Sequence, residues 1–205
     1  MADVKVSVIY YSATGSVFRL AQQAVEAAEN AGAEVRLRKV RELAPDEAIE
    51  SNEGSSKHAL ETQDIAEATA DDVVWADAVI FGTPTRYGNV SAQLKQYLDT
   101  LGPQWQQGQL ADKVYTGFVS TGTAHGGQET TLLALYNTVY HFGGILVPPG
   151  YTDPSKFVDG NPYGASHISA NGSNPPAEQD LTAVAYSATR ATKLAAQLKR
   201  GAAAA

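Results

Sequence analysis

Val4-Lys-Val-Ser-Val-Ile-Tyr-Tyr11 begins as an alternation of apolar and polar residues and ends as a continuous apolar run. This pattern predicts a β-strand buried on both faces of a sheet. A helix is expected over 17–31, where Val17, Leu20 and Ala24 share one stripe, and it ends at Gly32. A second strand is predicted over 34–40. Because a helix that joins two neighbouring strands makes them parallel, this stretch indicates an α/β fold.

The same alternation of strand and helix continues along the chain. Three more short apolar runs predict strands, at 78–82, 114–120 and 145–147. Further helices are predicted at 94–101, 127–142 and 177–199. Five strands alternating with helices, without a linker or an internal repeat, predict one doubly wound α/β domain over residues 1–200, followed by a disordered tail at 201–205.

Two segments interrupt this regular pattern. Residues 44–70 lack a clean period, so we expect a loop with short helical pieces. Residues 148–176 are rich in Pro, Gly, Asn and Ser, and we expect no helix or strand in them. A connection of that length is usually functional, and it contains Tyr151, Phe157 and Tyr163, which suits an arm that contacts another subunit.

Composition excludes several classes of site. The 205 residues include no cysteine, which excludes disulfides, zinc–thiolate sites and thiol nucleophiles. The four histidines show no i,i+4 pair, so no metal site is predicted. The net charge of -7 comes from an acidic segment at 42–72, which we interpret as a solvated surface excursion, and it argues against a nucleic-acid partner. The absence of a long apolar run or a signal peptide predicts a cytoplasmic protein without a membrane span.

Ligands of doubly wound sheets bind beyond the carboxyl ends of the strands, where three loops of this chain are unusual. The first loop, Ser12-Ala-Thr-Gly-Ser-Val17, opens a helix and offers hydroxyl and backbone N–H groups, which suit a phosphate. It has neither the Gly-Lys-Ser/Thr of a Walker loop nor the three spaced glycines of a dinucleotide-binding loop. An ordinary helix cap by Ser12 or Thr14 is the alternative.

The loops after the third and fourth strands suit a flat heterocycle. Thr83-Pro-Thr-Arg-Tyr-Gly-Asn89 presents backbone amides, a guanidinium and an aromatic ring, although its Pro-Thr and Gly-Asn pairs can also simply make turns. Ser120-Thr-Gly-Thr-Ala-His-Gly-Gly-Gln128 is glycine-rich and leads into a helix. We expect all three loops to contact one ligand.

These loops carry a resemblance to a known family. Ser12-x-Thr14-Gly15 resembles the flavodoxin-fold signature for the phosphate of FMN. Phe81-Gly-Thr-Pro-Thr-Arg-Tyr-Gly-Asn89, with Ser120-Thr-Gly-Thr123 and Pro162-Tyr-Gly-Ala165, resembles the WrbA-type NAD(P)H:quinone oxidoreductases. The resemblance covers nearly the whole chain. It implies a flavodoxin-like five-stranded sheet in the order 2-1-3-4-5, FMN as cofactor, and a homotetramer arranged as a dimer of dimers.

The resemblance also assigns residues to the site. Those implied for the phosphate are Ser12, Thr14, Gly15, Ser16 and Val17. Those implied for the isoalloxazine are Pro84, Thr85, Arg86, Tyr87, Ser120, Thr121, Gly122, Thr123 and Gly126. His141 matches a flavin-site histidine that a neighbouring subunit contributes, and Trp105 matches an aromatic residue that walls the substrate cavity.

The implied activity is the two-electron reduction of quinones by NAD(P)H. FMN accepts a hydride at N5 and passes two electrons onward, so one cavity that admits nicotinamide and then quinone predicts ping-pong kinetics. His141 is the candidate catalytic residue, as a donor to the quinone oxygen; packing between Tyr140 and Phe142 is the alternative. Two other functions stay open: a flavodoxin-type one-electron carrier and a flavin-binding scaffold or regulatory protein.

Overall fold

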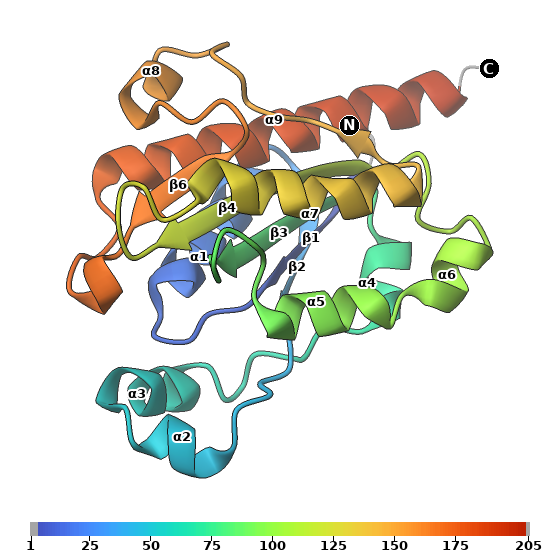
Figure 1. Cartoon of the computed structure of the whole chain (residues 1–205). Coiled ribbons are helices and arrows are strands. Elements are labelled where there is room, and N and C mark those ends of the chain that lie inside the picture. The colour runs from blue at the N-terminus through green and yellow to red at the C-terminus, as the bar shows by residue number, and fades with distance from the viewer. Residues whose placement is uncertain (1–3, 204–205) are drawn as a thin grey trace.

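A six-stranded parallel sheet lies between two layers of helices in the computed structural model, which describes residues 4–203 (Figure 1). The order β2-β1-β3-β4-β5 confirms the predicted flavodoxin-like arrangement. The five predicted strands are β1 Val4–Tyr10, β2 Ala33–Lys39, β3 Ala78–Pro84, β4 Val114–Thr121 and β5 Ile145–Leu146.

The sheet has one strand more than the five that the sequence predicts. β5 is short and pairs only with the start of β4, at Val114 and Tyr115. A sixth strand, β6 (Ala165–Ile168), pairs in parallel with the rest of β4, from Phe118 to Thr121. Two separate pieces of chain therefore make one edge of the sheet. The expectation of no strand in 148–176 is wrong because four residues in a Pro- and Gly-rich segment show no pattern that marks a strand.

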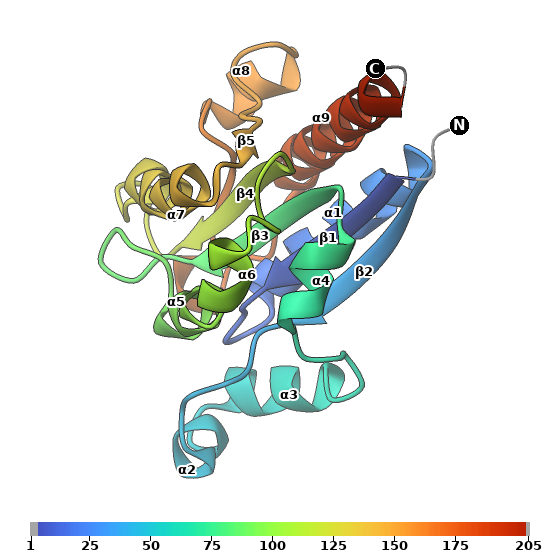
Figure 2. The same ribbon diagram turned by 90° about the vertical axis from the view of Figure 1, so that its right-hand side faces the viewer.

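Helices cover both faces of the sheet (Figure 2). On one face lie α1 Ser16–Asn30 and α9 Glu178–Ala203. On the other face lie α4 Ala70–Trp75, α5 Ala92–Asp99 and α7 Gln128–Phe142. Successive β1 residues serve the two cores, since Val8 packs under α1 and Ile9 packs on the opposite side. This alternation explains why β1 is apolar on both faces.

The acidic segment after β2 forms two short helices that protrude beyond the sheet (Figures 1 and 2). They are α2 Asp46–Glu50 and α3 Glu53–Glu61. α3 is not simply a solvated surface: its His58 is buried and its ring contacts the ring of Phe18 in α1, with centroids 5.5 Å apart. Asp72 at the end of the segment is also buried, where it pairs with Arg36 and Arg38.

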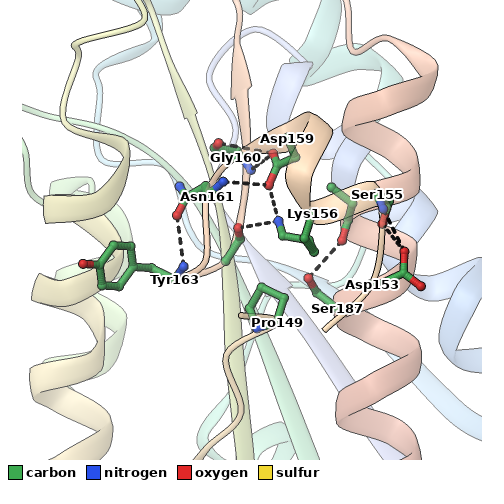
Figure 3. A network of polar contacts seen from close by, with 12 residues as sticks. Pro149, Asp153, Ser155, Lys156, Asp159, Gly160, Asn161, Tyr163 and Ser187 are labelled. Atoms are coloured by element: carbon green, nitrogen blue, oxygen red, sulfur yellow. Dashed lines mark hydrogen bonds and ion pairs between the residues drawn. The ribbon is translucent and has the colours of Figure 1, made fainter. Parts of the chain in front are cut away.

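The segment before α9 is held by a buried ion pair. It contains α8 Ser155–Asp159, then β6, then a 3-10 turn, η1 Ala170–Gly172, so the expectation of no helix in 148–176 is also wrong. Lys156 and Asp159 pair inside α8, where their side chains are 0% and 2% exposed (Figure 3). Lys156 also donates to Gly164 O (3.0 Å), and Asp159 accepts from the N–H of Asn161 (3.3 Å). The pair thus fixes the chain that leads into β6.

The C-terminal helix extends beyond its predicted end. α9 continues to Ala203, into the residues expected to form a tail, while residues 204–205 of that tail lie outside the described residues. No helix within residues 4–203 is both long enough and apolar enough to cross a lipid bilayer. The short helix α6, Gly102–Gln106, follows α5 and carries Trp105.

Candidate functional site

The loops after β1, β3 and β4 meet around one pocket of about 240 Å³ at the carboxyl end of the sheet. This meeting of the three loops agrees with the position expected for ligands of doubly wound folds. The pocket brings together most of the residues predicted for the cofactor, namely Ser12, Thr14, Ser16, Val17, Pro84, Thr85, Arg86, Ser120, Thr121 and Gly122. The predicted Gly15, Tyr87, Thr123 and Gly126 lie in the same loops but outside its lining.

The N-terminus of α1 supplies the anion-binding part of the pocket. Gly15 is its N-cap residue with φ 99°, and no side chain caps the helix. The alternative in which Ser12 or Thr14 caps α1 is therefore wrong. Ser12 Oγ instead accepts a hydrogen bond from the Gly15 N–H (3.1 Å). An uncapped first turn has free N–H groups and a positive helix end, a combination that binds phosphate.

The loop after β3 ends in a tight turn. Arg86 and Asn89 exchange two backbone hydrogen bonds (2.8 and 3.0 Å), while Tyr87 and Gly88 between them have φ of 53° and 78°. Positive φ at both central positions is typical of a type I′ turn. Of the two turns considered as an alternative, the one that contains Gly88-Asn89 is thus present, whereas Pro84 is the last residue of β3. This turn does not exclude ligand binding, since Thr85 and Arg86 line the pocket while Tyr87 is fully exposed at the tip.

The loop after β4 is held by its own hydrogen bonds. Thr121 Oγ1 donates to Thr123 O (2.8 Å), and the Gly126 N–H donates to the same oxygen (3.1 Å). Gln128 at the start of α7 donates to Thr121 Oγ1 (3.2 Å). Thr123 and Gly126 therefore shape this loop, while Gly122 lies at the pocket wall.

Sequence reasoning missed one side of the pocket, which residues 169–172 supply. Ser169, Asn171 and Gly172 follow β6 directly and line the pocket. Asn171 lies against Gly122: a Cβ at Gly122 would come within 2.9 Å of Asn171 Oδ1. The signal that could have located this side is Asn171-Gly172, a pair typical of turns, but its position depends on a strand that the sequence did not reveal.

His141 and Trp105 lie elsewhere. Trp105 Nε1 donates to His141 O (2.7 Å), and both side chains are exposed. α7 begins beside the pocket and has 15 residues, so at 1.5 Å per residue its end at His141 is about 20 Å away. Within one chain, the structure does not bring these two residues to the cofactor pocket.

A polar cluster lies behind the pocket, on the side of the acidic segment. Glu42 accepts hydrogen bonds from Tyr11 Oη (2.8 Å) and Gln93 Nε2 (2.7 Å). Burial by itself would raise the pKa of Glu42, but these bonds and two backbone N–H groups outweigh burial and hold the pKa below its usual value. In contrast, burial dominates at His58 and lowers the pKa of its imidazole.

Comparison with known proteins agrees with this geometry. The family model described as NADPH-dependent FMN reductase matches residues 4–156. The chain belongs to this family. Proteins similar to it include the "NAD(P)H dehydrogenase (quinone)" of Deinococcus radiodurans, 44% identical over 96% of this chain and 98% of that protein. The protein of the same name from Aromatoleum aromaticum is 39% identical over 98% of this chain and all of that protein.

Solved structures share the fold of this chain. A flavodoxin, WrbA-like protein from Agrobacterium tumefaciens superposes with a TM-score of 0.68 at 24% identity, covering 95% of this chain and 99% of that one. A flavodoxin from the domain Archaea superposes with a TM-score of 0.58 at 16% identity, covering 96% and 99%. The predicted relationship to the WrbA-type NAD(P)H:quinone oxidoreductases is thus confirmed.

Proposed function

We propose that this chain is an FMN-dependent enzyme that reduces quinones by two electrons at the expense of NAD(P)H. The uncapped N-terminus of α1, set in a pocket beside the hydroxyl side chains of Ser12, Thr14 and Ser16, is the observation that carries the proposal. Relatives at 39–44% identity named NAD(P)H dehydrogenase (quinone) support the reaction. A flavodoxin-type carrier and a flavin-binding scaffold are the alternatives.

The residues present fit FMN. Ser12, Thr14 and Ser16 offer hydroxyl groups beside the free N–H groups of α1, as a phosphate requires. A side chain at Gly122 would meet Asn171, so a glycine there lets this loop and residues 169–172 approach closely and line the pocket together. When bound, FMN supplies a ring that takes two electrons with a hydride from NAD(P)H and releases them to an acceptor.

Arg86 contributes charge and position to this chemistry. Its guanidinium lies at the pocket and donates from Nη1 to Thr85 O (2.8 Å), which holds the side chain against its own loop. A fixed positive charge there stabilises the negative charge that a flavin gains on reduction. The side chain is exposed, so Arg86 can also contact an entering substrate.

The proposal includes a second subunit. His141 and Trp105 complete the substrate cavity of a neighbouring chain in a homotetramer, with His141 as donor to the quinone oxygen. The exposure of Tyr140, Phe157 and Val158, each at least 65% exposed in the single chain, supports an apolar contact between subunits. A cytoplasmic location belongs to the same proposal, since the reaction consumes NAD(P)H.

The test is NADH oxidation by purified protein with benzoquinone, with and without added FMN. Turnover that requires FMN, with parallel double-reciprocal lines, supports the two-electron ping-pong enzyme. FMN binding without NADH oxidation would favour the carrier or scaffold, and a stable semiquinone on partial reduction would favour the carrier. Analytical ultracentrifugation tests the tetramer, and His141→Ala should lower turnover while leaving FMN affinity unchanged.

A further inference from the structure

A second hollow, of about 400 Å³, lies between the acidic segment and the carboxyl ends of β1 and β2. It shares Ser12, Ala13 and Arg86 with the FMN pocket, so the first loop separates two adjacent sites. Its size falls within the range of about 300–1,000 Å³ typical of small-molecule sites. Neither the family's description nor the names of the relatives assign it a ligand.

The charged groups of this hollow favour an anion. The oxygens of Glu42 are already occupied by Tyr11, Gln93 and two backbone N–H groups. Lys39 donates one hydrogen bond, to Thr62 O (2.6 Å), and the guanidinium of Arg86 donates one to Thr85 O. Both cations thus keep N–H groups that bond nothing else among residues 4–203, whereas both carboxylate oxygens of the half-buried Glu42 already accept hydrogen bonds. Glu67, the other acid of the lining, is exposed to solvent.

The wall of the hollow also holds buried polar atoms that make no hydrogen bond. Tyr10 Oη and His58 Nδ1 have no hydrogen-bond partner within the described part of the chain, and the nearest acid to His58 Nδ1 is Glu61, whose Oε2 lies 3.8 Å away. Both residues belong to the lining, which further includes Val40 and Ile49. Buried polar groups without a partner are destabilising, and a ligand that combines a flat apolar body with hydrogen-bonding edges relieves this cost.

We infer that this hollow binds the adenosine–phosphate half of NAD(P)H. Arg86 and Lys39 receive the phosphates, and the hollow beyond them receives the base and its ribose. A neutral quinone would not compensate the positive charges of Lys39 and Arg86, whereas phosphate groups would. Because Arg86 borders both pockets, a dinucleotide held there extends from the second hollow toward the FMN pocket. This inference rests on the proposed use of NAD(P)H.

The experiment titrates ADP-ribose, which lacks nicotinamide and undergoes no redox reaction, into the FMN-loaded protein by calorimetry. Ala48 is an exposed residue of α2 that lines the hollow, so Ala48→Trp fills it, while Glu50→Trp on the same helix does not. Lys39→Gln removes a cation from the hollow, and Lys57→Gln is its control, since Lys57 is exposed on α3 and outside the lining.

We expect ADP-ribose to bind the wild type and the two controls alike. Ala48→Trp should abolish binding, and Lys39→Gln should weaken it about tenfold, equivalent to about 1.4 kcal/mol. KM for NADH should rise in both variants, while FMN affinity and KM for benzoquinone stay unchanged. Equal ADP-ribose binding by wild type and Ala48→Trp overturns the inference, as does a wild type that binds none.

The same preparations separate this inference from the proposed function. If the wild type oxidises NADH with benzoquinone but Ala48→Trp leaves KM for NADH unchanged, the enzyme stands and the location of the nucleotide is wrong. If no NADH is oxidised, the proposed function fails, and ADP-ribose binding with its loss in Ala48→Trp still decides whether the hollow is an adenosine–phosphate site.

Discussion

Asp159→Asn removes one partner of the buried ion pair in α8 while keeping the size of the side chain. The ammonium of Lys156, which is 0% exposed, then stays buried without a counter-charge. Removing one partner of such a pair costs about 3–5 kcal/mol. Asparagine still offers an oxygen to the Asn161 N–H, and Gly164 O still accepts from Lys156, so we expect the lower end, about 3 kcal/mol.

Urea unfolding followed by circular dichroism measures this loss directly. A matched control is Asp99→Asn, which breaks the pair between Lys95 and Asp99 on α5, where both side chains are more than half exposed. Exposed pairs contribute about 0–1 kcal/mol. For a chain of this size about 3 kcal/mol also lowers the melting temperature by about 6–12 °C.

The reasoning fails if the free energies of unfolding of Asp159→Asn and Asp99→Asn differ by less than about 1 kcal/mol, which is the most that an exposed pair usually contributes. That result would mean that water reaches Lys156 or that the segment shifts at little cost. Because α8 leads into β6 and η1, FMN affinity should also fall in Asp159→Asn at temperatures where the protein remains folded, and Asp99→Asn should leave it unchanged.

Three other changes test separate parts of the structure. Gly82→Ala would place a Cβ 2.4 Å from the ring of Phe118, so stability should fall by about 1–3 kcal/mol in urea; a smaller change would show that the ring moves freely. Gly15→Val puts a β-branched residue at a position with φ 99°, which should cost about 1–3 kcal/mol of stability. It should also weaken FMN binding, measured by the quenching of FMN fluorescence. Burial would raise the pKa of Asp72, but hydrogen bonds from Thr69 outweigh burial and hold that pKa below its usual value. The ionised Asp72 therefore stabilises the folded protein above about pH 4, and this stabilisation is lost as the pH falls through the lower pKa of the folded state. Asp72→Asn should therefore destabilise the protein at pH 7 and flatten the acid limb of its pH–stability curve; an unchanged curve would contradict this account.

The central strands and their order could be predicted because their signals are local and strong. The end of β1 and the first half of β3 are continuously apolar, and in the structure Val8 and Ile9 do supply opposite cores. The first loop was informative for a similar reason. Gly15 precedes a helix with a clear apolar stripe, so the N-terminus of α1 could be located from the sequence.

The parts that the sequence did not reveal depend on contacts between distant residues. Ala165–Ile168 forms a strand because it pairs with the part of β4 that β5 leaves uncovered. Because η1 follows β6 in the chain, this pairing also places η1 beside the pocket. His58 is buried because it packs against Phe18 and beside Gly15, and the sequence pattern of α3 does not predict these contacts. The proposed roles of His141 and Trp105 need a neighbouring chain, which a single sequence does not position.

The divided edge of the sheet has a consequence for how a cofactor enters and leaves. β5 covers the start of β4 and β6 covers its end, so the ladder of paired residues along β4 is interrupted between Tyr115 and Phe118. The half of the edge that carries η1 to the pocket can thus separate without disturbing the central strands. In the apoprotein, amide hydrogens of β6 should exchange with solvent faster than those of β4, and FMN binding should slow their exchange. Local opening of this edge would then be the step that controls how FMN enters and leaves.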